Sequence, residues 1–120
     1  EIVKTLILCS SLRELRINAE LLDNEAASIF NGLKGLENLY VYGDAQSSEF
    51  VEVALSNLTS LKELSIVVDK LSDKAINAIK GCSKLEKLCL SECYNSSSFV
   101  EMLIPSLPLV REVEMNVRSL

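Results

Sequence analysis

The sequence predicts an α/β fold in which a solenoid of short repeats builds one curved parallel sheet, concave on its inner side, with helices on the convex side. Three observations predict it. A six-residue apolar pattern recurs five times, further apolar positions recur at fixed distances before it, and residues suited to helix ends lie between them. Repeats of this length are typical of stacked architectures, in which neighbouring units bury one continuous core.

The recurring segment has the form apolar-x-x-apolar-x-apolar. Its copies are Leu12–Ile17, Leu36–Val41, Leu61–Ile66, Leu85–Leu90 and Val110–Met115. They start 24, 25, 24 and 25 residues apart. Because side chains alternate between the two faces of a strand, each copy places its apolar residues on one face. The pattern therefore predicts about five short parallel strands.

The residues before each copy indicate a helix. Three positions before the start are Cys9, Leu33, Leu58, Cys82 and Leu107. Six positions before it are Leu6, Phe30, Leu55, Ile79 and Ile104, and ten before it are Ile2, Ala26, Val51, Ala75 and Val100. Spacings of three, six and ten residues follow one face of an α-helix. Each unit is therefore expected to contain a helix of about ten residues.

Residues with special roles at helix ends fall between these positions. We expect helix-capping side chains at Asp23, Ser48, Ser72 and Ser98. Gly32 and Gly81 lie near the expected helix ends, where a left-handed residue is commonly needed. Pro105 and Pro108 are expected to stop the last helix.

Residues 1–120 are expected to form a single domain of about four and a half repeats of 24 to 25 residues. The first unit begins inside an expected helix and the last residues follow an expected strand, and polar capping repeats are not evident. We therefore expect a segment of a larger protein, with further repeats or capping segments packed on both ends. Such segments would cover Ile2, Leu6, Met115 and Val117.

The segment Leu85–Cys93 resembles the LxxLxLxxN/C signature of the leucine-rich repeat family, and the general resemblance extends over the whole chain. Residues 71–75 and 81–85 look like the cysteine-containing subtype found in F-box substrate receptors of ubiquitin ligases. The general resemblance implies a solenoid that recognises proteins, and the subtype resemblance implies a substrate-recognition part of such a ligase. The sequence departs from the signature at its ninth position, which is occupied by Glu20, Asp44, Asp69 and Arg118 in the other units, and no F-box-like segment is evident.

Composition and charge argue against several classes of function. The chain carries 12 basic and 17 acidic residues, so its net charge of −5 does not favour nucleic-acid binding. No apolar run is long enough for a membrane span, and no signal peptide is evident. Cys9, Cys82 and Cys93 are interpreted as small buried hydrophobic residues and Cys89 as outward-facing. Unpaired cysteines favour a cytoplasmic or nuclear location.

Catalytic chemistry is not expected. The chain has no histidine, which removes the usual zinc ligand and the base of cysteine or serine nucleophiles. No motif for a cofactor or metal is present. Asn57 and Asn95 begin formal glycosylation motifs, but Asn57 is expected to lie in a packed turn. A ligand-binding fragment of a secreted or cell-surface receptor remains an alternative.

Strand residues between the apolar positions are expected to point to the concave face, where a protein partner would bind. The candidate partner-binding residues are Arg16, Asn38, Tyr40, Tyr42, Glu63, Ser65, Lys87 and Cys89. Exposed tyrosines are enriched in binding hot spots, which favours Tyr40 and Tyr42, although these rings could simply cover the sheet. The predicted function is a non-catalytic protein-interaction scaffold, and the alternative within that class is a regulatory or inhibitory subunit of an enzyme.

Overall fold

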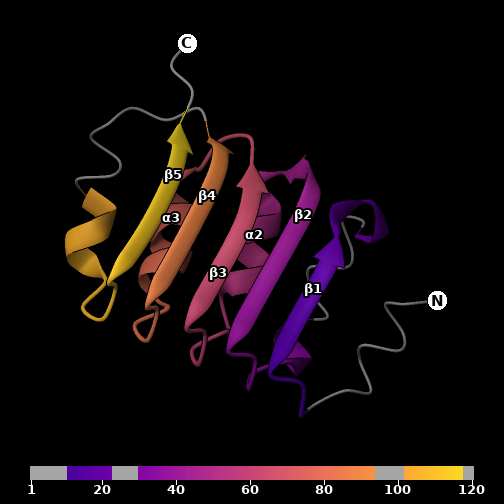
Figure 1. Ribbon diagram of the computed structural model, residues 1–120, viewed down its shortest axis with the longest axis horizontal. Coiled ribbons are helices and arrows are strands. Elements are labelled where there is room, and N and C mark those ends of the chain that lie inside the picture. Colours follow the sequence, from indigo (N-terminus) through magenta and orange to yellow (C-terminus); the bar gives the residue numbers. More distant parts are fainter. Residues whose placement is uncertain (1–10, 23–29, 94–101, 118–120) are drawn as a thin grey trace.

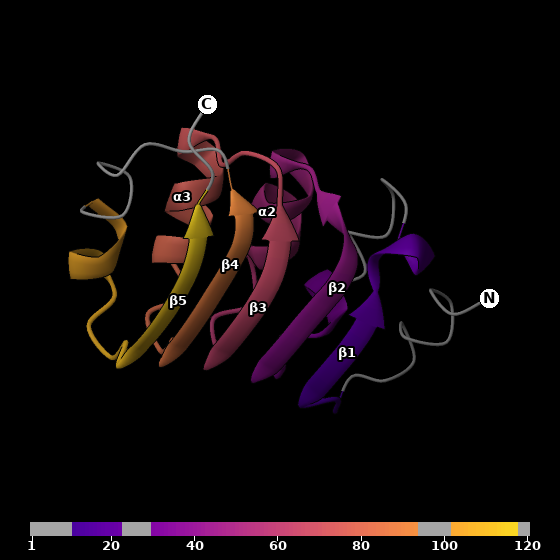
Figure 2. The ribbon, with the colours of Figure 1, turned by 45° about the horizontal axis from the view of Figure 1, so that its top comes forward.

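The computed structural model describes residues 11–22, 30–93 and 102–117. Its centre is a five-stranded parallel sheet with the strands in sequence order. The strands are β1 (Glu14–Asn18), β2 (Asn38–Gln46), β3 (Glu63–Val68), β4 (Lys87–Cys93) and β5 (Glu112–Val117). The helices α2 (Ser48–Leu55) and α3 (Asp73–Lys80) lie together behind the sheet (Figure 1, Figure 2). The prediction of about five parallel strands with helices on one side is confirmed.

Equivalent positions of the five apolar segments lie side by side across the sheet. Leu15 of β1 aligns with Leu39 of β2, which in turn aligns with Leu64 of β3. Leu64 aligns with Leu88 of β4, and Leu88 with Val113 of β5. A slip of one residue would turn every apolar side chain away from the helices, so the apolar pattern specifies this register.

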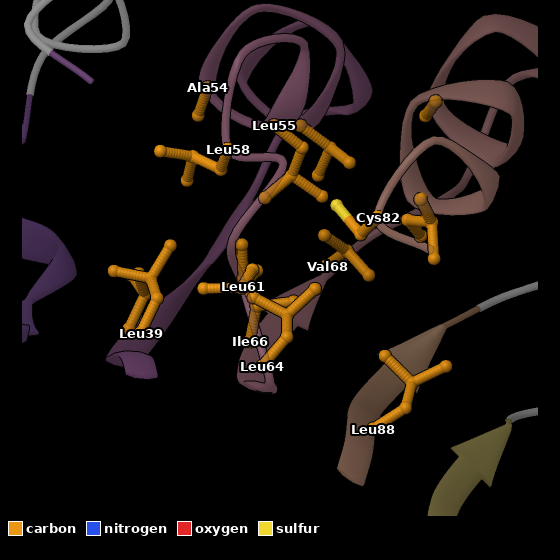
Figure 3. Close-up of a cluster of buried hydrophobic side chains, with 14 of the residues drawn as sticks. Leu39, Ala54, Leu55, Leu58, Leu61, Leu64, Ile66, Val68, Cys82 and Leu88 are labelled. Carbon is orange, nitrogen blue, oxygen red and sulfur yellow. The ribbon is translucent and has the colours of Figure 1, made fainter. Parts of the chain in front are cut away.

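The core fills the space between the sheet and the helices. The leucines of β2, β3 and β4 pack there against residues from α2 and the turn after it, including Ala54, Leu55 and Leu58 (Figure 3). The positions three before each segment are buried as predicted, at Leu33, Leu58, Cys82 and Leu107. Val113, on the outermost strand, is less covered and is 38% exposed. Cys9 lies outside the described residues.

One backbone turn recurs in four units and leads each chain segment into its strand. In the unit before β3, the Leu58 N–H donates to the Leu55 carbonyl and the Leu61 N–H to the Leu58 carbonyl, both at 3.2 Å. The same two bonds occur at Phe30, Leu33 and Leu36, at Ile79, Cys82 and Leu85, and at Ile104, Leu107 and Val110. The recurring apolar positions before each strand therefore also mark a recurring backbone geometry.

Helix α2 begins one residue earlier than predicted, and both α-helices have eight residues instead of about ten. The cap of α2 is Ser47, whose hydroxyl accepts from the Phe50 N–H at 3.3 Å, and the prediction of Ser48 is wrong. Ser47 follows the start of the apolar segment Leu36–Val41 at the same spacing at which Ser72 follows the start of Leu61–Ile66. The extra residue of the 25-residue unit therefore lies after the helix, at Ser56 and Asn57.

Ser72 caps α3 as predicted, accepting from the Ala75 N–H at 3.1 Å. Ser48 instead links the two helix starts, because its hydroxyl accepts from the Ser72 N–H at 2.7 Å. The Ser72 hydroxyl also donates to Glu52 at 2.8 Å. The predicted caps Asp23 and Ser98 lie outside the described residues.

The prediction of left-handed residues at the helix ends is wrong. Gly81 has φ −68°, because the chain continues in right-handed turns in which Gly81 donates to Asn77 and Cys82 donates to Ile79. Gly32 is not left-handed either, and Gly43 is the positive-φ glycine of the described residues, with φ 96°. Short 3₁₀ segments follow β1 (η1, Ala19–Leu21) and precede β5 (η3, Ile104–Ser106), and Pro105 lies at the start of η3.

Gly43 lies in an irregular part of β2. The pairing with β3 jumps from Val41–Ile66 to Gln46–Val68, so residues 42–45 lie opposite the single residue Val67. Tyr42 and Asp44 are exposed in this part of the strand. In the parts of the chain that the structure describes, no helix is long and apolar enough to cross a membrane.

Candidate functional site

The sheet face opposite α2 and α3 carries the polar residues of the strands, and we call it the open face. Its side chains alternate with the buried ones along each strand. It comprises Glu14 and Arg16 of β1, Asn38 and Tyr40 of β2, Glu63 and Ser65 of β3, Lys87 and Cys89 of β4, and Glu112 and Glu114 of β5. The pairing register places these residues in two adjacent rows across the sheet. Tyr42, which follows the buried Val41 and pairs with Asn18 of β1, extends the open face beyond these rows.

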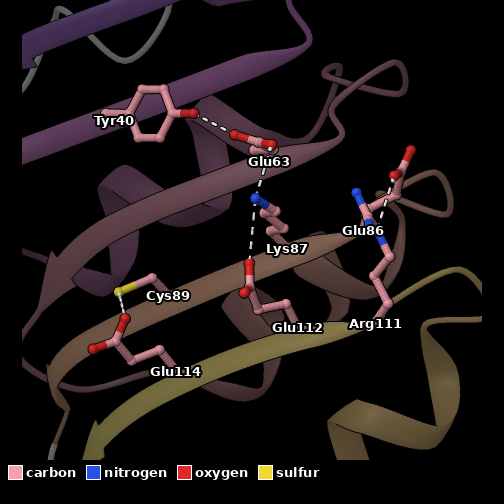
Figure 4. Close-up of polar contacts among 8 residues, drawn as sticks. All are labelled: Tyr40, Glu63, Glu86, Lys87, Cys89, Arg111, Glu112 and Glu114. Atoms are coloured by element: carbon pink, nitrogen blue, oxygen red, sulfur yellow. Dashed lines mark hydrogen bonds and ion pairs between the residues drawn. The ribbon is translucent and has the colours of Figure 1, made fainter.

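Tyr40 connects three strands on the open face. Its hydroxyl donates to the Glu63 carboxylate (Figure 4), and the Arg16 guanidinium lies over its ring at 4.5 Å from the centroid. The hydrogen bond to Glu63 raises the pKa of Tyr40 to about 12, with smaller contributions from burial and from the Glu63 charge. Arg16 opposes this shift. The phenol is thus held neutral and in one orientation.

Lys87 lies between two carboxylates. Its Nζ is 3.8 Å from Glu63 Oε1 and 3.3 Å from Glu112 Oε2 (Figure 4). On the next row, Cys89 Sγ lies 3.9 Å from Glu114 Oε2. Each of these pairs joins neighbouring strands, so the side chains of β3, β4 and β5 form one polar cluster.

A pocket of about 310 Å³ opens in this cluster. It is lined by Tyr40, Glu63, Leu64, Ser65, Lys87, Leu88, Cys89, Glu112 and Glu114. We call it the acidic pocket, because its lining contains three carboxylates and one ammonium group. It is small by comparison with ligand sites in proteins, which typically occupy about 300 to 1,000 Å³.

A third set of charged residues precedes the strands and alternates in sign across the sheet. This charge row consists of Arg13, Glu37, Lys62, Glu86 and Arg111. Glu37 lies 3.9 Å from Arg13 and 3.6 Å from Lys62, and Arg111 lies 3.4 Å from Glu86. Solvent-exposed pairs of this kind are individually worth less than about 1 kcal/mol.

The structure brings most of the predicted site residues together. Five of the eight line the acidic pocket, namely Tyr40, Glu63, Ser65, Lys87 and Cys89. Arg16 contacts the ring of Tyr40, and Asn38 lies between Glu14 and Glu63 in the register. Tyr42 does not line the pocket and is 53% exposed beside the bulge of β2.

Two charged pocket residues, Glu112 and Glu114, were missing from the predicted set, as were the buried Leu64 and Leu88. Glu112 and Glu114 occupy the positions of β5 that pair with Lys87 and Cys89. Their place in the repeat was sufficient to find them.

The described cysteines are both free. Cys82 is 1% exposed, as predicted, and burial raises the pKa of its thiol to about 11. Cys89 lies on the open face as predicted and is half-buried. Nothing is described of the Cys93 side chain, so its predicted burial lies outside the described structure, as does Asn95.

The expectation that Asn57 lies in a packed turn is wrong. Its neighbour Leu58 is fully buried, but Asn57 points outward and is exposed. The Asn57 amide donates to Asn31 Oδ1 at 2.6 Å. In this turn, the burial of Leu58 does not extend to the residue before it.

Among the residues that the structure describes, no group of three or more histidine, cysteine, aspartate or glutamate side chains is placed to hold a metal ion. Comparison with protein-family models, with curated proteins and with solved structures finds no match to this chain.

Proposed function

We propose that this chain is a non-catalytic protein-interaction segment that holds a protein partner on the open face of its sheet. One observation carries the proposal. Five strands in register present polar and aromatic side chains on a face that α2 and α3 leave uncovered, with a pocket at its centre. Exposed sheet faces with convergent polar groups are suited to recognition.

The side chains of the open face are held by contacts with one another, so they would lose little conformational freedom when a partner binds. Tyr40 is held between Arg16 and Glu63, and Lys87 between two carboxylates. A surface whose side chains are ordered before binding avoids part of the entropic cost of association. Tyr42 adds an exposed ring of the type enriched in hot spots.

We further propose that the chain is a leucine-rich repeat solenoid whose open face is concave. The unit spacing of 24 to 25 residues, the recurring turn before four strands and the signature of Leu85–Cys93 support this assignment. Helices are wider than strands, so stacking such units bends the sheet toward its open side.

Within this class, the resemblance of residues 71–75 and 81–85 to the cysteine-containing subtype favours a substrate-recognition part of a ubiquitin ligase in the cytoplasm or nucleus. The free thiols of Cys82 and Cys89 support a reducing compartment. An F-box-like helical segment elsewhere in the same polypeptide would support the ligase assignment. A regulatory or inhibitory subunit of an enzyme is expected to lack one.

The test compares two exposed side chains, one on a strand of the sheet and one on a helix behind it. Tyr42 is 53% exposed at the bulge of β2, and Val53 is 43% exposed on α2. A partner is captured from extract with the wild-type protein and purified, and its affinity for the variants Tyr42→Ala and Val53→Ala is measured by calorimetry.

We expect Tyr42→Ala to weaken binding of the purified partner by about tenfold or more, the effect of a hot-spot tyrosine. Val53→Ala should bind as the wild type does. Equal affinities for all three proteins would rule out the open face around Tyr42 as the binding surface. Turnover of the partner by the wild-type protein would contradict the non-catalytic assignment.

A further inference from the structure

We infer that the partner inserts a cationic side chain, of the arginine type, into the acidic pocket. The inference rests on the proposed function and names the chemistry that the open face recognises. The pocket lining carries carboxylates at Glu63, Glu112 and Glu114 against the single ammonium group of Lys87. A cationic group entering the pocket would therefore meet a net negative charge.

Glu114 carries one of the two excess negative charges of the pocket lining and has no cationic neighbour among the described residues. Lys87 is shared between Glu63 and Glu112, which leaves neither carboxylate entirely without a counter-charge. Glu114 has the Cys89 thiol at 3.9 Å, which is a weak donor, and no basic side chain of the described residues forms an ion pair with it. This carboxylate is available to a cation from outside.

The spacing of the two β5 carboxylates suits a guanidinium group. Glu112 and Glu114 are two residues apart on one face of the strand, which separates their Cα atoms by roughly 7 Å. A planar guanidinium offers five N–H donors in a fork and can bond two carboxylates simultaneously. A compact ammonium group would satisfy one of them less completely.

The size and walls of the pocket fit one long side chain better than a larger ligand. Its volume of about 310 Å³ is at the lower limit for small-molecule sites. Leu64, Leu88 and the ring of Tyr40 contribute apolar wall that the methylene groups of an arginine can cover. An acidic partner would be repelled by the same carboxylates.

The experiment uses N-acetyl-arginine amide as the probe and N-acetyl-citrulline amide as its uncharged isostere. Both are titrated into the isotope-labelled chain at constant ionic strength, and the backbone amide signals of Ser65, Cys89 and Glu114 are followed by NMR. The test variant is Glu112→Gln with Glu114→Gln. The matched control is Glu20→Gln with Asp69→Asn, which removes two exposed carboxylates outside the pocket.

We expect saturable shifts with the arginine probe for the wild type and the control, and none with the citrulline probe. The double Gln variant should bind arginine about fivefold more weakly, as expected for the loss of a partly exposed charge pair. Any one of three outcomes overturns the inference. These are no saturable arginine shift in the wild type, equal binding of citrulline, and unchanged arginine binding in the double Gln variant.

The captured partner separates this inference from the proposed function. A partner whose affinity falls with Tyr42→Ala but not with Glu112→Gln and Glu114→Gln uses the open face without the pocket, and it refutes the inference alone. A partner unaffected by either variant refutes the proposed function, even when the arginine probe binds. A fall in affinity with both variants supports the two together.

Discussion

At the scale of single residues, Tyr40 determines how the open face is held. Its ring lies under Arg16 of β1 and its hydroxyl bonds Glu63 of β3, while its backbone belongs to β2. The aromatic side chain therefore joins three strands outside the backbone ladder. A change at either neighbour is expected to alter the ionisation of the phenol.

Glu63→Gln should lower the pKa of Tyr40 from about 12 toward its ordinary value of 10.0, because the hydrogen bond to the carboxylate is its largest cause. The folded protein keeps the phenol protonated above the pH at which the unfolded chain releases the proton. The stability from this bond is therefore complete below pH 10 and is lost as the pH rises toward 12.

Ultraviolet absorbance of ionised tyrosine, followed during a pH titration, measures this pKa. Urea unfolding at pH 8 and at pH 11 measures the free energy of unfolding. This free energy should fall more between pH 8 and pH 11 for the wild type than for Glu63→Gln. Tyr42→Phe is the control for the assignment, since it removes a different phenol. An unchanged high-pH titration in Glu63→Gln would contradict the role of this bond.

The site could be predicted from the sequence as far as the repeat reaches. Alternation along the strands identified Tyr40, Glu63, Ser65, Lys87 and Cys89, because outward positions follow directly from the buried ones. The ion pairs of Lys87 with Glu63 and Glu112 depend on the rotamers of these side chains. The repeat pattern carries no information on rotamers.

At the scale of the elements, β2 differs from its neighbours through the bulge at residues 42–45. Gly43 has φ 96°, and an ideal Cβ there would lie 3.0 Å from Asn18 Oδ1. Asn18 is held in place, because its side chain accepts from the Glu20 N–H at 2.9 Å and caps η1. The bulge therefore has little room for a side chain at Gly43.

Gly43→Ala should destabilise the fold by about 1 to 2 kcal/mol, because alanine disfavours positive φ and its Cβ would crowd Asn18. Gly32→Ala is the matched control, since an added Cβ there meets nothing within 4 Å. Urea unfolding followed by circular dichroism gives both values. If the two variants were equally stable, the conformation of the bulge would not depend on glycine.

The elements themselves were largely predictable, and their ends were not. Burial of Leu33, Leu58 and Cys82 follows from the recurring apolar positions. The cap of α2 was placed one residue too late because the prediction used a fixed distance before β3. The segment between α2 and β3, at Ser56 and Asn57, is one residue longer than its counterpart after α3. Neither the site of such an insertion nor the right-handed conformation of Gly81 can be read from apolar spacing, since both depend on local hydrogen bonds.

At the scale of the whole molecule, the charge row counteracts a problem of in-register sheets. Register places equivalent residues of successive repeats side by side, so identical repeats would stack like charges. In this chain Arg13, Glu37, Lys62, Glu86 and Arg111 alternate in sign instead. The carbonyls of the first four also accept backbone N–H groups from the next unit, so charge and backbone pairing coincide.

Lys62→Glu should destabilise the sheet by about 1 kcal/mol at low ionic strength, because it replaces the 3.6 Å pair with Glu37 by three neighbouring carboxylates. Lys70→Glu, in the exposed loop after β3, makes the same change in net charge outside the row. Thermal unfolding of both variants is compared in dilute buffer and in about 1 M NaCl, which screens such interactions. If the lower stability of Lys62→Glu relative to Lys70→Glu were the same in high salt, the loss would not be Coulombic in origin.

The alternation of charge over an odd number of described strands affects how two copies of the sheet could pair end to end. An alternating row over five strands ends with the same sign at both edges, here Arg13 beside β1 and Arg111 beside β5. Copies joined end to end into a fibre, in the register used within the chain, would bring Arg111 against Arg13 and Glu112 against Glu14. The register that pairs the described strands would therefore place like charges side by side if β5 of one copy were to pair with β1 of another.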